Sequence, residues 1–591
     1  MLKKRHLMAH LACTAVLTIS SLSATPSMGE ENPYENSPVP SLVHLAGKTY
    51  RGLLIDEVKR FDTANKKEIQ QQDLTDQDLQ NKAPFFWAMT QAMPVEVWRD
   101  LVFGACYHIA TRRDKVEGMF FAVTVADPDL TSPLHIRLMG YMASLDLTHI
   151  ELTHALGQSK NFFSQLARNE CLIQKLSLEG TLTTNRSTGL LRGLAELRFL
   201  KSLNLSWNQF FITDFEEITK LTQLEELIWR TNPFTNHISH LTALHNLRVL
   251  DLQSSKTEVS LEKLSSFTAL EELNLSKTSQ PINGLKHLQH FHGLRSLNLA
   301  NCGMIKDASG VLLPQSLEIL NVNQCALAAQ PRVLTHLTRL VDLEIAGNRL
   351  GDALLEIAPL SRLTRLVAGH NDAPRSLTFL EQFTNLQGLH LAGNTQISTD
   401  FLRSLTNLRA LSLASALLSE VEEDLHPLKN LFFLDLAKNP IQHLRNLSCG
   451  NTLQILNIEG TGLQFLTELT GLSQLKKVTL SNNSWNDLDQ TLGFFTGLTE
   501  LNSENLNMGA HLLALTSLSR LQVLNLDNNV LRKGPGSYHV PQMTVLETLR
   551  ALKKLSVQKT ELFKSDPILE ALSKRNVEIV RDHRIGSKKF S

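Results

Sequence analysis

The sequence contains none of the short motifs that hold catalytic groups at a fixed spacing. It has no paired-histidine metal motif, no Gly-x-Ser-x-Gly elbow, no Cys-x-x-Cys pair and no glycine-rich dinucleotide turn. Gly47-Lys48-Thr49 resembles the end of a phosphate-binding loop, but Leu42 stands where such a loop needs its first glycine. We therefore expect no catalytic residue, no cofactor and no metal ion, and we expect binding rather than catalysis.

Four side chains in the middle of the chain favour contact with a protein partner: Arg365, Val367, His390 and Phe433. Exposed Phe and Val beside Arg and His are typical of a binding patch rather than of a solvated face. Because these residues are far apart in the sequence, they can form one patch only if a regular architecture brings them together.

A nine-residue phrase, L-x-x-L-x-L-x-x-N, supplies such an architecture by returning roughly every 22 to 24 residues. Its clearest copy runs from Leu200 to Asn208. On a strand, the leucines at positions four and six point to one face, and the residues between them point to the other. One copy cannot bury its leucines alone, but stacked copies form a continuous apolar core.

This phrase resembles the leucine-rich repeat, and the resemblance covers about three quarters of the chain, residues 141–562. It implies an α/β fold: a solenoid with a curved parallel sheet on its concave face and short helices or turns on its convex face. About eighteen copies are expected. They begin at Met142, Ile173, Leu200, Leu224, Leu247, Leu270, Leu294, Leu317, Leu340, Leu363, Leu386, Leu408, Leu431, Leu453, Leu475, Leu498, Leu521 and Leu552.

The asparagine at position nine is expected to satisfy backbone groups of the turn, with successive copies stacked as a ladder. Cys302 and Cys325 occupy this position in consecutive copies. A buried thiol can also donate to the turn, and we favour a reduced pair there. Adjacent strands lie about 5 Å apart, so a disulfide is the alternative.

The concave face is where a partner is expected, because its strand positions are freed from the core. Position seven is small in the middle copies, which predicts a shallow trough bordered by Arg365, Val367, His390 and Phe433. Tight curvature would also favour small residues there, so the sequence leaves both interpretations open. The small residues are Ala300, Ala346, Gly369, Ala392, Ala414 and Ala437.

Residues 1–24 are interpreted as a secretory signal peptide. Three basic residues precede a mostly apolar stretch from Leu7 to Leu22, and small residues follow. A membrane anchor is the alternative, but the stretch is short and is interrupted by polar residues. Residues 25–84 are interpreted as a linker and a partly ordered polar segment.

Residues 85–140 are interpreted as a small helical region. The segment from Met93 to Val102 resembles the opening of an F-box, since Pro94 suits a first helical turn and shares a face with Val97 and Leu101. The resemblance implies docking to a ubiquitin-ligase adaptor through Pro94, Val97, Trp98 and Leu101. The Trp expected in the second half of the motif is missing. A helical cap on the first repeat is the alternative.

Composition excludes some classes of partner. The chain is 42% hydrophobic and 20% charged with a formal net charge of zero, which gives no electrostatic footprint for nucleic acid or an anionic membrane. Residues 563–591 are interpreted as a C-terminal cap, with a helix over 566–575, and a basic tail. A turn-rich loop at 532–538 interrupts the spacing of the last copies.

The leading hypothesis is a non-enzymatic scaffold that binds a protein on its concave face and is exported by a bacterium, into the periplasm or the medium. An F-box-like adaptor for a host ubiquitin ligase is the second hypothesis, which requires delivery into a host cell. An internalin-like surface adhesin is the third. After removal of the signal peptide, no membrane span is expected.

Overall fold

The computed structural model describes residues 149–581, except 152–161, 168–173, 181–190, 209–211, 233–240, 255–258, 279–281, 303–311, 327–333, 446, 448, 532–539, 561 and 563–565. The chain divides into two compact units, Met1–Leu273 and Asn274–Ser591. The expected signal peptide, linker, F-box-like helix and basic tail, and the loop at 532–538, lie outside the described residues.

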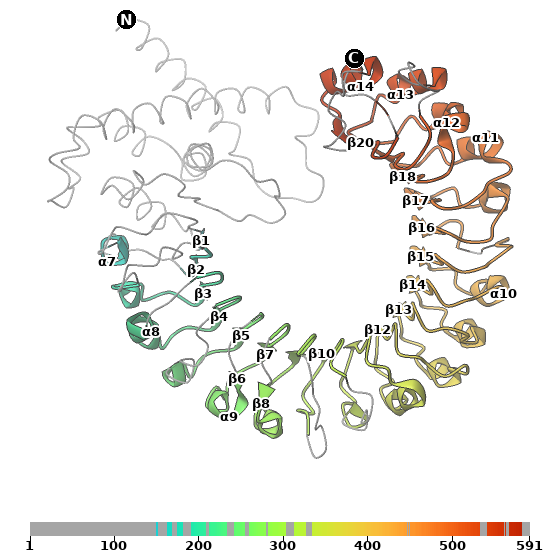
Figure 1. Ribbon diagram of the computed structural model, residues 1–591. Helices are drawn as coiled ribbons and strands as arrows, with labels where there is room; N and C mark the ends of the chain where they lie inside the picture. Colours follow the sequence, from blue (N-terminus) through green and yellow to red (C-terminus); the bar gives the residue numbers. More distant parts are fainter. Residues whose placement is uncertain are drawn as a thin grey trace, which may run out of the picture. The chain divides into compact units, whose positions relative to one another are not determined.

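In the first unit, strands β1 to β5 pair in order and in parallel. They lie on the inner side of the ribbon, and the helices lie on its outer side (Figure 1). The elements are β1 (His149–Glu151), α7 (Phe162–Ala167), β2 (Lys175–Ser177), a 3-10 helix (Leu194–Glu196), β3 (Ser202–Asn204), α8 (Ile212–Thr219), β4 (Glu226–Ile228), β5 (Val249–Asp251), β6 (Val259–Ser260) and α9 (Leu261–Leu264). Strand β7 (Glu272–Asn274) spans the boundary between the units.

In the second unit, strands β9 to β21 pair in order and in parallel. They line the concave side of this unit (Figure 1). The strands are β8 (Ile282–Asn283), β9 (Ser296–Asn298), β10 (Ile319–Asn321), β11 (Asp342–Glu344), β12 (Arg365–Val367), β13 (Gly388–His390), β14 (Ala410–Ser412), β15 (Phe433–Asp435), β16 (Ile455–Asn457), β17 (Lys477–Thr479), β18 (Glu500–Asn502), β19 (Val523–Asn525), β20 (Lys554–Ser556) and β21 (Glu578–Val580).

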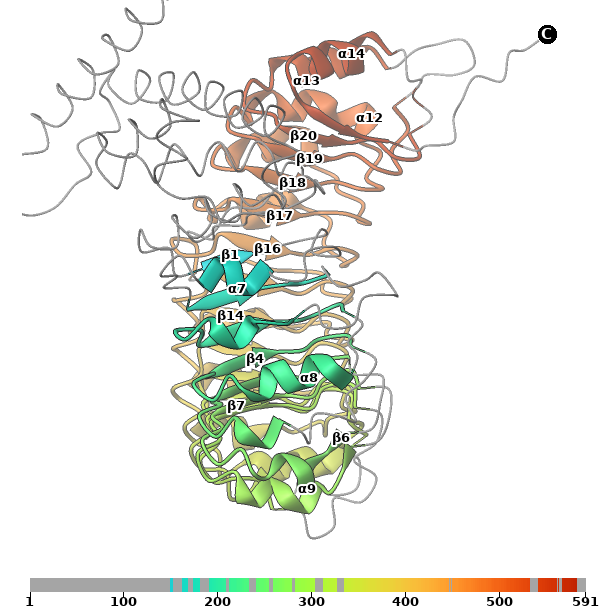
Figure 2. The same cartoon turned by 90° about the vertical axis from the view of Figure 1, so that its left-hand side faces the viewer.

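Short helices cover the convex side of the second unit, and α13 and α14 lie side by side at its C-terminal end (Figure 2). The α-helices are α10 (Glu422–Leu425), α11 (Leu488–Thr491), α12 (Met508–His511), α13 (Val545–Thr548) and α14 (Pro567–Lys574). The 3-10 helices are Leu285–His290, Gly351–Ile357, Thr378–Gln382, Asp400–Ser404, Leu466–Leu469, Leu492–Phe494, Leu512–Ser517 and Pro541–Thr544. The helix expected over 566–575 is α14, which Asp566 caps by accepting from the Ile568 N–H at 3.0 Å.

The solenoid predicted from the repeat phrase is confirmed, and so is its register. Each copy from Ile173 to Leu552 carries its strand at positions three to five, and equal positions pair across strands, as in Leu343 with Leu366 and Leu366 with Leu389. Positions four and six are buried, and Leu343 has no exposed surface. Aligned leucines thus form one core in each unit.

The expected first copy was placed five residues too early. Two overlapping phrases fit the apolar pattern, one beginning at Met142 and one at Leu147. Strand β1 pairs His149 with Lys175, which is position three of the next copy. The first copy therefore begins at Leu147, because pairing with β2 selects the second phrase.

The asparagine ladder is confirmed in the second unit. The backbone N–H of Asn348 donates to Oδ1 of Asn371, and that of Asn371 donates to Oδ1 of Asn394, both at 2.9 Å. Each Nδ2 donates to backbone carbonyls of its own copy and the preceding one; for Asn371 these are Ala368 and Ile345, at 3.1 and 3.0 Å. These side chains are almost completely buried, so each of these hydrogen bonds takes the place of one that the same group makes to water in the unfolded chain.

The ladder has a gap at Ala416, which occupies position nine and is fully buried. The Asn394 N–H donates to the Leu391 carbonyl at 3.3 Å rather than to a neighbouring side chain. On the other side, the Ala416 N–H still donates to Oδ1 of Asn439 at 2.9 Å. One cross-link of the ladder is therefore missing between these two copies.

Candidate functional site

Three strands of the second unit carry the four residues expected to bind a partner. Arg365 and Val367 lie on β12, His390 on β13 and Phe433 on β15. Arg365 is exposed and the other three are half-buried, whereas Leu366, Leu389 and Leu434 between them are at most 2% exposed. The alternation places all four side chains on the concave face and not in the core.

The strand register makes a row of the third positions. Arg365 pairs with Gly388, Gly388 with Ala410, and Ala410 with Phe433. Only these two small residues separate Arg365 from Phe433 over three strand steps, about 14 Å. Val367 and His390 pair in the adjacent row. We call this surface, bordered by Arg365, Val367, His390 and Phe433, the trough.

The seventh positions contribute less to the trough than their size suggested. Ala392 and Ala437 are only 8% and 4% exposed, and Gly369 is buried as well. A Cβ at Gly369 would lie 2.7 Å from the Ala392 carbonyl oxygen and 3.0 Å from Nδ1 of His390. The small residues therefore allow close packing of successive turns. The stem of Arg365 lies over Gly388, 3.5 Å from where a Cβ would stand, so Ala410 is the small residue between that stem and Phe433.

Arg365 is held by two carboxylates, which the sequence analysis missed. Its guanidinium lies 2.8 Å from Asp342 and 2.7 Å from Glu344, both on β11. Burial alone would lower the pKa of Arg365, but the two carboxylates raise it above its usual value. The cation is thus fixed in position at one end of the trough, and its charge is compensated there.

His390 presents a neutral ring to the trough. Burial lowers its pKa below the usual value and outweighs the opposing effect of the Asp435 carboxylate. The ring packs over Gly369, and its buried Nδ1 has no hydrogen-bond partner among the described residues. At neutral pH the trough is lined by an uncharged imidazole, Val367 and Phe433, so it favours a largely apolar contact.

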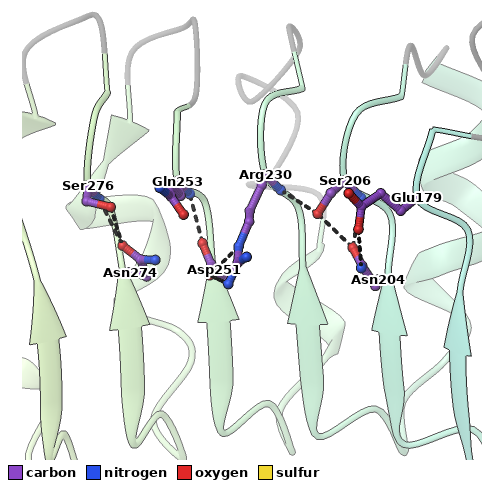
Figure 3. A network of polar contacts seen from close by, with 8 residues as sticks. All are labelled: Glu179, Asn204, Ser206, Arg230, Asp251, Gln253, Asn274 and Ser276. Atoms are coloured by element: carbon purple, nitrogen blue, oxygen red, sulfur yellow. Dashed lines mark hydrogen bonds and ion pairs between the residues drawn. The ribbon is translucent and has the colours of Figure 1, made fainter. Parts of the chain in front are cut away.

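Polar side chains on the concave face are largely occupied by one another. In the first unit, Oδ1 of Asn204 accepts from N and Oγ of Ser206 at 3.0 and 2.6 Å, and Arg230 pairs with Asp251 at 2.8 Å (Figure 3). In the second unit, Asn274 accepts from Ser276 in the same way (Figure 3). The recurrent fifth-position asparagine therefore caps the end of its own strand.

A cavity lies beside the trough, at the edge where the strands begin. This cavity of about 450 Å³ is lined by residues just before or after the first leucine of successive copies. We call it the rim groove; its residues are Arg362, Thr364, Asn385, Gln387, Asn407, Arg409 and Asn430. A cavity of about 470 Å³ at Phe465 and Glu468 differs, because its Arg445 pairs with Glu468 at 3.1 Å.

Cys302 and Cys325 are free and buried, as the favoured interpretation predicted. Sγ of Cys302 donates to the Leu275 carbonyl at 3.0 Å, and Sγ of Cys325 donates to the Leu299 carbonyl at 2.9 Å. Burial raises the pKa of Cys325 to about 12 and that of Cys449 to about 11. All three groups are therefore thiols at neutral pH, and those of Cys302 and Cys325 are satisfied by the turns they occupy.

We expect a thiol reagent to leave these three cysteines unmodified in the native protein. The thiolate is the reactive species, and burial suppresses both its formation and its access to reagent. Peptide mapping after maleimide treatment should find Cys302, Cys325 and Cys449 labelled only when denaturant is added first. Labelling of any of them at native conditions would contradict this burial.

The described residues contain neither a metal-ligating cluster nor a helix that could span a membrane. Within them, no three His, Cys, Asp or Glu side chains gather closely enough to hold a metal ion. Among the same residues, no helix has the length and apolarity that a membrane span requires. Pro94, Val97, Trp98 and Leu101 lie outside this part of the chain.

The parallel register, the buried leucines and the asparagine ladder define the fold as a leucine-rich-repeat solenoid. No protein-family model matches the chain. It is similar to a subunit of the human volume-regulated anion channel (24% identity over 35% of this chain and 27% of that protein) and to receptor-like protein 6 of Arabidopsis thaliana (31% over 25% and 16%). The matched region thus spans less than a third of either relative.

A solved leucine-rich repeat protein of Leptospira interrogans is also similar in structure. The two share 24% identity, and the match covers 70% of this chain and 97% of that chain with a TM-score of 0.45. These comparisons concern the repeat. They name no partner for this chain.

Proposed function

We propose that this chain is a non-enzymatic scaffold that holds a protein partner on the concave face of its second unit, with the trough as the central contact. The observation that carries the proposal is the row Arg365, Gly388, Ala410, Phe433, in which two small residues separate a fixed cation from an aromatic ring. Aromatic and Arg anchors around a recess are typical of the energetically dominant part of an interface.

The side chains around the trough are either paired with opposite charges or uncharged, which supports a protein surface as the ligand. Arg365 is paired with Asp342 and Glu344, so the three side chains together carry one formal negative charge and leave no unpaired cation. His390 is uncharged. A partner would insert an apolar side chain over Gly388 and Ala410 and place a hydrogen-bond acceptor near the free edge of the guanidinium.

The test begins with capture of a partner from extract by the full chain, followed by affinity measurement with variants. We expect Phe433→Ala to weaken binding about 30-fold, the effect of losing a hot-spot aromatic. Ala410→Trp, which fills the trough, should weaken it at least as much. Phe494→Ala is the matched control, because Phe494 is 62% exposed in a convex-side helix. Unchanged affinity for Phe433→Ala would remove the trough from the interface.

We further propose that the protein is exported, on the strength of the basic and apolar pattern of residues 1–24. The adaptor hypothesis depends on Pro94, Val97, Trp98 and Leu101, and capture of a ubiquitin-ligase adaptor that Val97→Asp abolishes would favour it. The adhesin hypothesis rests on the repeat phrase alone.

A further inference from the structure

We propose that the rim groove binds an acidic segment of a protein in the polyproline II conformation, with carboxylates three residues apart. The inference takes a protein as ligand from the proposed function and adds a second recognition site beside the trough. It rests on unpaired arginines, on their spacing, and on an exposed aromatic ring at one end of the groove.

The two arginines of the groove carry uncompensated charge. Neither the Arg362 nor the Arg409 guanidinium has an ion-pair or hydrogen-bond partner within the described residues. Arg365 on the neighbouring concave row, by contrast, is held by two carboxylates. Planar guanidinium groups without partners match the bidentate geometry of a carboxylate.

The charge of this rim has one sign over a long stretch. The residues directly before and after the first leucine of the seven copies from Leu340 to Leu475 include four basic side chains and no acidic one. Their field attracts an anionic segment along the whole rim and not at a single point. The basic side chains are Arg339, Arg362, Arg409 and Lys476.

The spacing of the arginines selects the conformation of the ligand. Arg362 and Arg409 belong to copies two strand steps apart, which is about 10 Å. Polyproline II rises about 3.1 Å per residue with three residues per turn, so residues three apart share a face at about 9 Å. In an extended strand, residues three apart point to opposite faces. Carboxylates at the first and fourth residues of a polyproline II segment can therefore reach both arginines.

The rest of the groove suits such a segment. Asn407 and Asn430 each donate one amide N–H to a preceding carbonyl, Thr384 at 2.8 Å and Thr406 at 3.1 Å, which fixes both side chains. Their side-chain carbonyl oxygens remain as acceptors for a solvated ligand backbone. Phe432 follows Arg409 along the rim, with its N–H bonded to the Arg409 carbonyl at 2.8 Å, and it is 43% exposed. Proline rings dock on such aromatic surfaces.

The experiment measures binding of a labelled peptide of four Glu-Pro-Pro repeats to the full chain by fluorescence anisotropy. Saturable binding that weakens with salt is expected, because the contacts are exposed ion pairs. A Gln-Pro-Pro peptide should not bind, and a peptide with four glutamates in Glu-Pro repeats should bind more weakly, because its carboxylates have the wrong spacing.

The double variant Arg362→Gln, Arg409→Gln should weaken peptide binding about tenfold. Arg349→Gln, Arg375→Gln is the matched control; both arginines are exposed, lie beyond the strand ends and lose the same charge. The control should change affinity by less than about twofold. Equal thermal unfolding of both variants and the unmodified protein would show that folding is intact.

Three results would overturn the proposal: no saturable binding of the peptide, equal loss in the control pair, or binding of polygalacturonate with none of the peptide. The last result would assign the groove to an acidic polysaccharide. None of these results bears on the proposed role of the trough. Phe433 lies in a different row from the rim groove, and its variant is measured against the captured partner. The two proposals therefore fail separately.

Discussion

Replacing Asn371 by alanine is expected to lower the free energy of unfolding of the second unit by about 3 kcal/mol. The change removes the acceptor of the Asn348 N–H and one donor each from the Ile345 and Ala368 carbonyls. Asn371 has no exposed surface, so water does not replace these bonds without rearrangement. Chemical denaturation followed by circular dichroism would measure the loss.

The matched control is Asn385→Ala, since Asn385 is exposed at the edge of the same sheet. Its effect should stay within about 0.5 kcal/mol. If both variants unfold at the same denaturant concentration as the unmodified protein, the ladder contributes little to stability. Because stability in a repeat array is local, the transition of Asn371→Ala should also broaden or split.

Gly509→Ala is expected to destabilise the C-terminal end of the second unit by about 3 kcal/mol. Gly509 lies in α12, and a Cβ there would overlap the carbonyl oxygen of Val530 in the following copy. The obstacle is backbone, which cannot rotate away as a side chain can. Relief requires α12 to move from the neighbouring copy, which breaks the packing between them.

Gly471→Ala provides the control, because nothing lies within 4 Å of a Cβ at that position. It should leave stability within about 0.5 kcal/mol of the unmodified protein. Thermal unfolding followed by tryptophan fluorescence would compare them, since Trp485 lies in the same part of the array. If Gly509→Ala leaves the stability unchanged, α12 and the Val530 carbonyl must lie farther apart than in this structure.

The repeat made the fold predictable because it ties burial to position. Strand pairs such as β12 and β13 follow from their leucines alone, since only one register places Leu366 beside Leu389 in the core. Near Met142 and Leu147, two registers satisfy the same apolar pattern, and only the pairing of β1 with β2 distinguishes them.

The candidate site was predictable only in part. Alternation indicated that Arg365, Val367, His390 and Phe433 face away from the core, but it did not indicate that Asp342 and Glu344 hold Arg365. The rim groove was missed because its residues lie directly before and after the first leucine of each copy, outside the strand positions that were considered for binding. The asparagine recurring before the first leucine, at Asn385, Asn407 and Asn430, is the signal that could have indicated it.

The alanine at position 416 has a mechanical consequence. From Cys325 to Asn394, every copy is clipped to the next by an N–H that reaches a neighbouring Oδ1, and the same clip joins Ala416 to Asn439. Between Asn394 and Ala416 that clip is absent, so among the copies from Cys325 to Asn439 a stretching force meets the least-fastened pair there. These two copies can separate while Asn394 and Asn439 keep their bonds to the Leu391 and Leu436 carbonyls.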